Sequence, residues 1–309
     1  MIVTLGIFLI SIFLLFFISN YLVSALIHFS RKAKLSTFFV GVIILSIGTT
    51  IPEFVDSVIS SLQGVGELGF GTLLGSSVTN VCLVLGVAAI ISPIRRLTRN
   101  ETKEGFFVLL ATLVFLGLTF VGSGLDMVDG LILISLFFVL QYIFRKKEVT
   151  HKGELVFNEI QVDLVLIPVL LLGVFTSGFV AVGSTVALTQ ELGISLTFFG
   201  LTVMSLSTSL PELASSIVSS FKKNSKMAVG NVLGSNLNNL LLIGGIMALI
   251  NPVHVQIDDV FIFTAVFITV VSVLFILMTF FDRDVDKRDG LILLAFYLIF
   301  IFWLSLMSG

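Results

Sequence analysis

Ten long apolar segments, separated by short polar breaks, dominate this 309-residue sequence. They cover residues 3–27, 36–61, 70–92, 105–122, 128–144, 164–189, 195–221, 228–250, 260–281 and 290–307. A helix needs about 20 apolar residues to cross the hydrocarbon core of a bilayer, and most of these segments meet that length. They are too long and too continuous for the alternating strands of a transmembrane barrel. The segments therefore predict an all-α polytopic membrane protein with ten transmembrane helices.

Composition agrees with this fold class and excludes others. Only 12% of the residues are charged and 57% are hydrophobic, whereas an ordinary soluble domain carries roughly 25% charged residues. The net charge of −2 argues against a nucleic-acid partner, and the single cysteine can form no internal disulfide. The first segment lacks the basic start and the cleavage site of a signal peptide, so we expect it to be retained as a helix.

The basic residues predict the orientation of the chain. All 17 lysines and arginines lie in the odd-numbered connections between segments, while the even-numbered connections carry only acids. Under the positive-inside rule the odd connections are cytoplasmic, which places both the N and the C terminus outside. We therefore expect a multi-pass protein of the cell membrane in that orientation.

The longest hydrophilic stretch divides the chain into two halves. We predict a first five-helix repeat over 1–144, a cytoplasmic linker over 145–161 and a second five-helix repeat over 162–309. Because each half has an odd number of spans, the second half enters the membrane in the opposite sense to the first. This is the layout of an inverted repeat, which is common in secondary transporters.

The two halves are also similar in amino-acid sequence. Shifting the sequence by 159 residues aligns 41–93 with 200–252 without a gap, and about one third of the paired residues are identical. Residues 46–53 (SIGTTIPE) pair with 205–212 (SLSTSLPE), and 71–80 (GTLLGSSVTN) pair with 230–239 (GNVLGSNLNN). The matches are mostly Gly, Ser, Thr, Pro, Glu and Asn, so shared hydrophobicity does not explain them. We interpret them as an internal duplication.

A glutamate follows a proline near the middle of the second and the seventh span, at Glu53 and Glu212. Proline cannot donate a helical hydrogen bond, so the helix should kink or unwind there and free carbonyls about one turn upstream, those of Thr49 and Thr208. An ionised carboxylate in mid-membrane is costly and usually functional. Two carboxylates with carbonyl, hydroxyl and amide oxygens form a donor set that suits hard cations such as Ca²⁺ and Na⁺. Glycine pairs such as Gly230–Gly234 are equally typical of close helix packing.

These motifs resemble the α-repeats of the cation/Ca²⁺ exchanger superfamily, and most closely its prokaryotic Na⁺/Ca²⁺ exchangers. The resemblance implies ten helices in two inverted repeats, and exchange of cytosolic Ca²⁺ for external Na⁺ by alternating access. It makes Glu53 and Glu212 the carboxylates shared by Ca²⁺ and Na⁺. The other positions that it implies all supply oxygen donors: backbone oxygens from Thr49 and Thr208, and also from Ser46 and Ser205; hydroxyls from Thr50, Ser209, Ser76 and Ser235; and side-chain amides at the lateral positions Asn80 and Asn239.

Some residues depart from the family pattern. Exchangers of this branch commonly have aspartate where this chain has Asn239, which keeps an oxygen but removes a titratable charge. Asp56 is an additional acid, three residues after Glu53 and on nearly the same helix face, and its repeat partner is Ser215. Asp56 either carries a coupling ion or proton in place of the missing carboxylate, or faces polar neighbours and tunes the site without binding transported ions. The coupling ion thus stays open among Na⁺, K⁺ and H⁺.

We therefore expect an antiporter with no catalytic residues and no cofactor, whose partners are Ca²⁺, monovalent cations and the lipid bilayer. A K⁺- or H⁺-coupled cation exchanger on the same scaffold is the alternative. A cation channel and an intramembrane hydrolase are less favoured, since the inverted repeat is typical of transporters and the spans contain no nucleophile or metal motif. The sequence does not indicate an oligomeric state.

Overall fold

The protein is a bundle of long helices. The computed structural model describes residues 2–33, 35–64, 66–148, 157–191, 202, 204–280 and 284–307. Within this part, seven helices are long and apolar enough to cross a membrane, or eight if one bent pair counts as a single span. The predicted spans 164–189 and 195–221 include residues outside the described part, so the number ten stays a prediction. Apart from one pairing of two-residue strands, the regular structure of the described residues is helical, which confirms the helical fold class.

The elements follow the order of the predicted segments. The first half contains α1 (Ile2–Lys32), α2 (Thr37–Val40), the π-helical η1 (Gly41–Leu45), α3 (Ser46–Thr49), α4 (Ile51–Leu62), α5 (Gly66–Thr79), the π-helical η2 (Asn80–Val84), α6 (Leu85–Ile91), α7 (Arg99–Gly122), β1 (Gly124–Leu125) and α8 (Met127–Glu148). The second half contains α9 (Phe157–Glu191), α11 (Ser205–Thr208), α12 (Leu210–Phe221), α13 (Ser225–Leu237), the π-helical η4 (Asn238–Ile243), α14 (Gly244–Ile250), β2 (Val253–His254), α15 (Asp259–Phe280) and α16 (Lys287–Met307). Helices thus extend into both ends of the predicted linker 145–161, because α8 continues to Glu148 and α9 begins at Phe157.

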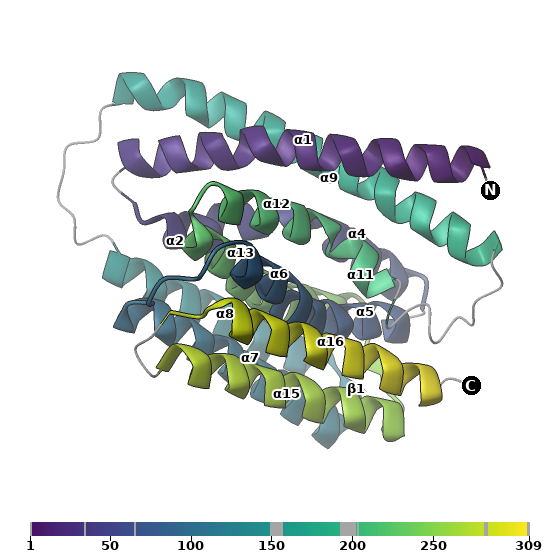
Figure 1. Ribbon diagram of the computed structural model, residues 1–309. Helices are drawn as coiled ribbons and strands as arrows, with labels where there is room; N and C mark the ends of the chain where they lie inside the picture. Colours follow the sequence, from purple (N-terminus) through teal and green to yellow (C-terminus); the bar gives the residue numbers. More distant parts are fainter. Residues whose placement is uncertain are drawn as a thin grey trace.

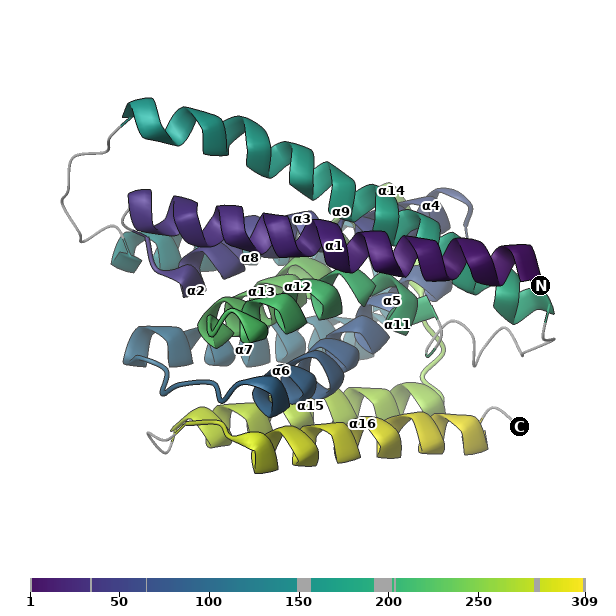
Figure 2. The same ribbon diagram turned by 45° about the horizontal axis from the view of Figure 1, so that its top comes forward.

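The helices form layers. Figures 1 and 2 both show α1 and α9 on one side of the bundle, α15 and α16 on the other, and the short helices α12 and α13 between them. Ile18 lies against Gly173, and Ile7 lines the same groove as Val180, so α1 and α9 run antiparallel. Both chain termini lie at the same end of the bundle (Figure 1). Antiparallel packing of α1 and α9 is expected of an inverted repeat, which stays a prediction here, as does the side of the membrane on which the termini lie.

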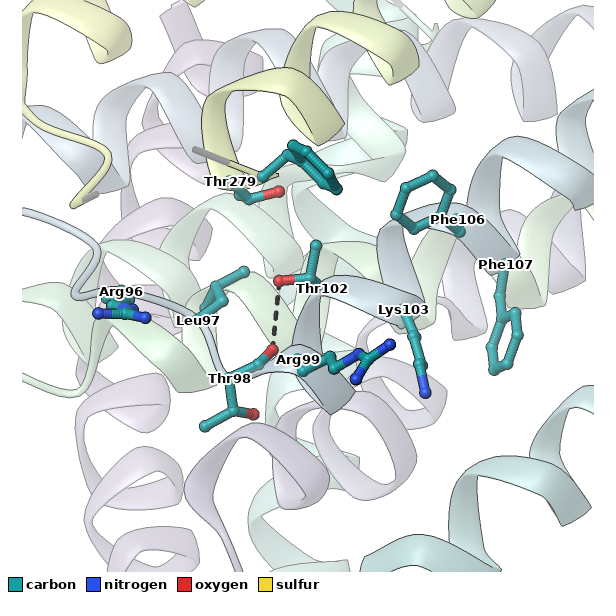
Figure 3. A pocket seen from close by; sticks show the side chains of 10 residues that line it. Arg96, Leu97, Thr98, Arg99, Thr102, Lys103, Phe106, Phe107 and Thr279 are labelled. Atoms are coloured by element: carbon teal, nitrogen blue, oxygen red, sulfur yellow. Dashed lines mark hydrogen bonds between the residues drawn. The ribbon is translucent and has the colours of Figure 1, made fainter. Parts of the chain in front are cut away.

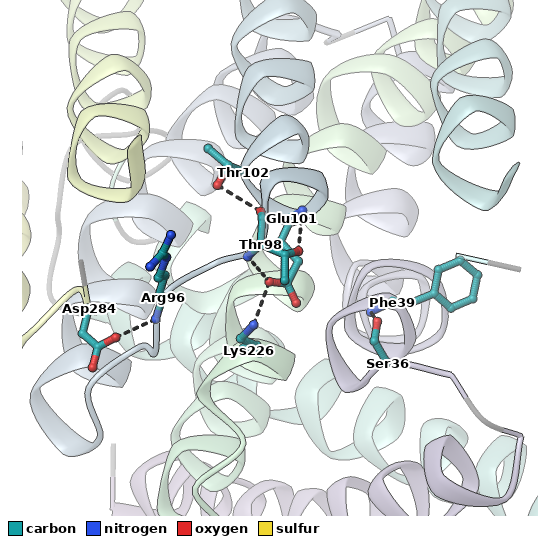
Figure 4. Close-up of polar contacts among 8 residues, drawn as sticks. All are labelled: Ser36, Phe39, Arg96, Thr98, Glu101, Thr102, Lys226 and Asp284. Carbon is teal, nitrogen blue, oxygen red and sulfur yellow. Dashed lines mark hydrogen bonds and ion pairs between the residues drawn. The ribbon is translucent and has the colours of Figure 1, made fainter. Parts of the chain in front are cut away.

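The helix that contains the fourth predicted segment begins earlier than that segment. Helix α7 starts at Arg99 and not at residue 105, because Thr98 and Glu101 form a capping box: the Glu101 carboxylate accepts from the Thr98 backbone N–H at 2.6 Å, and the Thr98 hydroxyl accepts from the Glu101 N–H at 3.3 Å. Glu101 also forms a salt bridge of 2.8 Å with Lys226 at the start of α13, shown in Figure 4. The box satisfies backbone donors that a later start would leave open.

The two proline–glutamate motifs produce the same break in the helix. Thr50 separates α3 from α4 with φ −83° and ψ 6°, and Ser209 separates α11 from α12 with φ −82° and ψ 6°. The axis bends by 46° between residues 37–49 and 51–62. In each motif the proline lies in the first turn of the following helix, where its missing N–H leaves no helical bond unmade. The prediction of a break at each proline is therefore confirmed.

Glycines allow the second span, which contains α2 and η1, to pack closely against α13 of the eighth span. A Cβ on Gly41 would lie 2.5 Å from the carbonyl oxygen of Met227, and one on Gly230 or Gly234 would contact the backbone carbonyl of Phe38 or Val42, respectively. Backbones can approach this closely only where side chains are missing. The packing interpretation of the Gly230–Gly234 pair is thus confirmed, and this contact joins the two halves beside Glu53 and Glu212.

Replacing Gly230 with alanine should destabilise the protein by about 1–3 kcal/mol, because the new methyl group would overlap the backbone of Phe38 and force η1 and α13 apart. Thermal unfolding in detergent measures the effect. Gly117→Ala on α7 is the matched control, since a Cβ there meets nothing within 4 Å. Equal unfolding temperatures for the two variants would show that the contact between η1 and α13 does not stabilise the bundle.

Candidate functional site

Two fully buried glutamates lie at the centre of the candidate site. Glu53 is in the first turn of α4 and Glu212 in the first turn of α12, and neither side chain is exposed. They are close enough to each other for their charges to interact. The Oε2 atoms of both carboxylates are buried and accept no hydrogen bond from the described residues. Buried carboxylate oxygens need compensation, and no basic side chain in the described part of the chain supplies it.

Each glutamate is approached by hydroxyl groups. The Ser209 hydroxyl donates to Oε1 of Glu53 at 3.4 Å, from the other half of the chain. The Ser235 hydroxyl donates to Oε1 of Glu212 at 3.2 Å. Thr208 interacts with Glu53, and Thr49 interacts with Glu212. Each carboxylate therefore interacts with a threonine from the helix break of the opposite half.

The remaining predicted hydroxyl positions surround the breaks. The Ser76 and Thr208 hydroxyls lie 3.1 Å apart, and Ser76 also donates to the carbonyl of Ser205 at 3.3 Å. The hydroxyl of Thr50 donates to the Ser46 carbonyl at 2.8 Å. All of these residues are buried. The structure thus gathers the predicted serines and threonines around the glutamates, with the Ser46 and Ser205 carbonyls each accepting a bond from a neighbouring hydroxyl.

The two predicted amides behave differently from each other. Asn80 donates to Oδ1 of Asn236 at 3.0 Å, and its own Oδ1 is buried without a hydrogen-bond partner in the described part. Asn239 is fully buried, and neither its Nδ2 nor its Oδ1 has a partner among the described residues. An amide buried without any partner costs about 1–3 kcal/mol for each lost bond, so the fold tolerates Asn239 at a cost in stability.

The sequence prediction did not include three further asparagines as members of the site. Asn231 accepts a hydrogen bond from Thr49 at 3.2 Å, Asn236 donates to the Ser77 carbonyl at 3.2 Å, and Asn238 donates to the hydroxyls of Ser46 and Thr50 at 3.3 and 3.4 Å. Their repeat partners are Thr72, Ser77 and Thr79. The sequence signal for them is that 230–239 contains more amides than 71–80. These additional amides form hydrogen bonds with residues of the first half.

The described residues contain no group of three or more His, Cys, Asp or Glu side chains able to hold a metal ion. Asp56 is half-buried one turn beyond Glu53, interacts with Thr72, and has an Oδ2 atom that is buried without a hydrogen-bond partner. Its role in coupling or in tuning the site stays a prediction. Its polar neighbour Thr72 belongs to α5.

This donor set consists of oxygen atoms only. Carboxylate, hydroxyl and amide oxygens are the donors that Ca²⁺ and Na⁺ prefer, whereas zinc and copper sites use His or Cys. A bundle of apolar helices with broken helices and buried acids at its centre is typical of polytopic membrane transport proteins.

Comparison with known families is consistent with this class. A family model described as "Sodium/calcium exchanger protein" matches residues 3–146 and 162–306. The chain belongs to this family of sodium/calcium exchangers. Membership of a transporter family, whose substrates are Ca²⁺ and Na⁺, confirms the predicted superfamily and the prediction that the protein is a multi-pass membrane transporter and not an enzyme.

Individual relatives cover almost the whole chain. Sodium/calcium exchanger MaX1 of Methanosarcina acetivorans is 24% identical over 326 residues, with 92% of this chain and 93% of that protein covered. An uncharacterized membrane protein of Methanocaldococcus jannaschii is 28% identical, with 95% of each chain covered. Among solved structures, the sodium-calcium exchanger NCX_Mj soaked with 10 mM Na⁺ and 10 mM Sr²⁺ superposes with a TM-score of 0.85 at 26% identity, covering 96% of this chain and 97% of that one.

Proposed function

We propose that this protein is a secondary antiporter that exchanges Ca²⁺ for Na⁺ across the cell membrane, with the ions bound at the membrane midplane between the two halves. The observation that carries the proposal is the pair of buried glutamates, each with one carboxylate oxygen that has no protein partner in the described part. Two ionised glutamates neutralise one Ca²⁺ or two Na⁺, so the two substrates would compete for the same charge. Competition for one site is the basis of obligatory exchange.

The predicted ligands have distinct roles in this proposal. Glu53 and Glu212 supply the shared charge, and the backbone oxygens of Thr49 and Thr208, together with those of Ser46 and Ser205, complete a central shell. The flanking hydroxyls extend the shell to the monovalent ions, and they belong to Thr50, Ser209, Ser76 and Ser235. Asn80 and Asn239 offer neutral oxygens at the sides, which suits any ion bound beyond the two that the glutamates neutralise.

Alternating access would use α1 and α9 as the moving layer. Their buried apolar residues pack with α12 and with the region around Val40 and Leu45, in a hydrophobic cluster separate from the main core. Gly178 of α9 lies against both motif prolines: a Cβ there would be 2.8 Å from Pro211 and 4.0 Å from Pro52. Because α1 and α9 carry none of the candidate ligands and pack through a cluster separate from the main core, we infer that they would shift relative to the glutamates.

Transport in reconstituted vesicles tests the proposal. Purified protein is placed in liposomes, and uptake of radiolabelled Ca²⁺ is measured with outward gradients of Na⁺, K⁺ or H⁺ in parallel. We expect the Na⁺ gradient to accelerate Ca²⁺ uptake. A choline gradient of the same size, which is the control for a cation that is not transported, should have no effect. Uptake that no gradient accelerates would exclude an antiporter, and uptake that persists without any counter-ion would favour a cation channel.

Two observations bear on the alternative of K⁺ or H⁺ as a coupling ion. The side chain at the lateral position 239 is an amide, so this position carries no negative charge. Part of the chain is also 27% identical over 124 residues to a protein named sodium/potassium/calcium exchanger 2 of Homo sapiens, although this covers only 40% of this chain and 19% of that protein. In the vesicle assay, this alternative predicts that Ca²⁺ uptake requires an outward gradient of K⁺ or H⁺. That gradient would act either alone or together with a Na⁺ gradient.

Asp56→Asn separates the two interpretations of this acid. If Asp56 only tunes the site, the variant should keep the same coupling ion and change uptake by less than about tenfold, because one interaction with a polar neighbour is worth about 1.5 kcal/mol or less. If Asp56 carries a coupling ion or proton, the gradient dependence itself should change. Because Asp56 interacts with the polar neighbour Thr72, we expect the first result, measured as Ca²⁺ uptake under each of the three gradients.

A further inference from the structure

Asn238 is a buried amide that has no role in the proposed ion site. It is the first residue of η4 in the second half of the chain, and it is 1% exposed. Its Nδ2 atom donates hydrogen bonds to two hydroxyls of the first half, that of Ser46 at 3.3 Å and that of Thr50 at 3.4 Å. Its Oδ1 atom is buried and has no hydrogen-bond partner in the described part of the chain. Asn238 therefore contacts the helix break before Glu53 from the opposite half.

The orientation of this amide follows from the two hydroxyls. The Thr50 hydroxyl donates to the carbonyl of Ser46 at 2.8 Å, and the Ser46 hydroxyl donates to the carbonyl of Val42. A hydroxyl group has one hydrogen and two lone pairs, so each of these oxygens can only accept a further bond. The amide must then turn its Nδ2 atom, and not its Oδ1 atom, toward them.

The bond between Thr50 and Ser46 is not unusual in itself. A threonine in a helix often donates to the carbonyl four residues earlier, and Figure 3 shows the same bond between Thr102 and Thr98 on α7. Thr50 is different because an amide of the other half also donates to its oxygen. This bond uses one of the two lone pairs, and it places an N–H hydrogen with positive partial charge beside the other.

The corresponding hydroxyl of the second half has no such donor. The repeat partner of Thr50 is Ser209, and the repeat partner of Asn238 is Thr79. The side chain of threonine has no N–H group and is shorter than that of asparagine. Among the described residues, none donates a hydrogen bond to the Ser209 hydroxyl, so both of its lone pairs are available.

The two hydroxyls also differ in their relation to the glutamates. The Ser209 hydroxyl donates to Oε1 of Glu53 at 3.4 Å. By repeat position, the corresponding bond would join Thr50 to Glu212. Within the described part, however, Thr50 donates to backbone carbonyls of its own segment. Ser209 thus combines two available lone pairs with a bond to a carboxylate, whereas Thr50 has one lone pair and no such bond.

We propose that Asn238 is a positioning residue that makes the two flanking monovalent sites unequal, so that a monovalent cation binds more weakly beside Thr50 than beside Ser209. This inference rests on the proposed function, in which both hydroxyls serve flanking ions. Such ions are held by oxygen lone pairs, and an N–H group that points at the same oxygen competes with the cation and repels it. The site beside Ser209 is therefore filled at the lower Na⁺ concentration, and the site beside Thr50 is filled second.

Asn238→Leu tests the inference, because leucine has nearly the same shape as asparagine but no N–H group. Both hydroxyl hydrogens keep their carbonyl partners, so the ion-free variant should be about as stable as wild type. Binding of Na⁺ to the purified full-length protein is measured as the rise in unfolding temperature with NaCl, compared with choline chloride. We expect the apparent Kd for Na⁺ to fall by about 2-fold to 10-fold, the equivalent of one net hydrogen bond. The apparent Kd for Ca²⁺, measured in the same way, should not change.

Double-mutant cycles locate the effect. In a Thr50→Val background the hydroxyl is absent, so adding Asn238→Leu should change the apparent Kd for Na⁺ by less than about twofold. Ser209→Ala is the matched background, in which the full effect of Asn238→Leu should remain. Asn238→Thr, which introduces the residue type of the repeat partner, should act in the same direction as Asn238→Leu and gives a second variant if leucine impairs folding.

The inference is overturned if Asn238→Leu leaves the apparent Kd for Na⁺ unchanged or raises it, or if its effect is equal in the Thr50→Val and Ser209→Ala backgrounds. An equal change in the apparent Kd for Na⁺ and Ca²⁺ would also overturn it, since Asn238 would then act on the site as a whole. Failure of the proposed function gives a different result. Neither Na⁺ nor Ca²⁺ would then stabilise wild-type protein more than choline does, and both proposals would be wrong.

Discussion

Replacing Glu53 or Glu212 with glutamine is expected to reduce the apparent affinity for Ca²⁺ by at least about 100-fold and to abolish uptake at micromolar Ca²⁺. Glutamine keeps the shape and one oxygen of each side chain but removes the negative charge, and the affinity of a Ca²⁺ site follows its ligand charge. A loss of about 2.7 kcal/mol corresponds to that factor, within the range for a charged contact in a buried site. Both residues are fully buried, so water cannot compensate the lost charge.

The measurement is Na⁺-driven Ca²⁺ uptake into vesicles over a range of Ca²⁺ concentrations. Glu67→Gln is the matched control, because Glu67 is an exposed acid in the first turn of α5 and loses the same group. The control should transport as wild type does. A glutamine variant with unchanged Ca²⁺ dependence would remove that glutamate from the site, whatever its effect on stability.

The same substitutions should leave the ion-free protein as stable as wild type, or more stable. In the described part, no basic side chain pairs with either glutamate, and each has an oxygen with no partner. Removing one of two interacting buried charges relieves repulsion, whereas removing one member of a buried ion pair costs about 3–5 kcal/mol. Stability without ions and transport should therefore respond in opposite directions, which distinguishes a ligand from a structural carboxylate.

The sequence was sufficient to predict the features that follow from local chemistry. Proline cannot donate a helical bond, so a break near Pro52 and near Pro211 was predictable, and the structure has it two residues earlier in both halves. Small residues permit close backbone contact, so the packing of Gly230 and Gly234 was predictable too. Long apolar segments gave the helical class because only helices satisfy their backbone groups within one segment of a membrane.

Features that depend on contacts between the two halves were not predictable from one sequence. Asn238 supports Ser46 and Thr50 across the interface, and the repeat partner of Asn238 is a threonine that could not do so in the same way. Spacing places Asp56 one turn beyond Glu53, but it does not predict which neighbouring helix supplies its polar partner, here Thr72 of α5. Thr98 and Glu101 extended α7 through side-chain bonds that a measure of hydrophobicity does not register.

Asn239→Leu is expected to weaken the dependence of transport on the monovalent ion by about 10-fold to 100-fold while leaving the ion-free protein as stable as wild type. Leucine has nearly the shape of asparagine, and Asn239 has no hydrogen bond to lose in the described part. Replacing a buried amide without partners by an apolar group of the same size is neutral or stabilising. If the Asn239 oxygen contacts the coupling ion, its loss removes a charged contact of about 1.5–3 kcal/mol.

Asn236→Leu gives the contrast, because Asn236 is equally buried but uses both ends of its amide, accepting from Asn80 at 3.0 Å and donating to the Ser77 carbonyl at 3.2 Å. This variant should lower the free energy of unfolding by about 1–3 kcal/mol for each group left without a partner. The two variants are compared by thermal unfolding without ions and by the Na⁺ concentration that gives half-maximal Ca²⁺ exchange. If Asn239→Leu destabilised the protein as much as Asn236→Leu and left the Na⁺ dependence unchanged, Asn239 would be a structural residue, and the neutral ligand for an additional ion would have to be sought at Asn80.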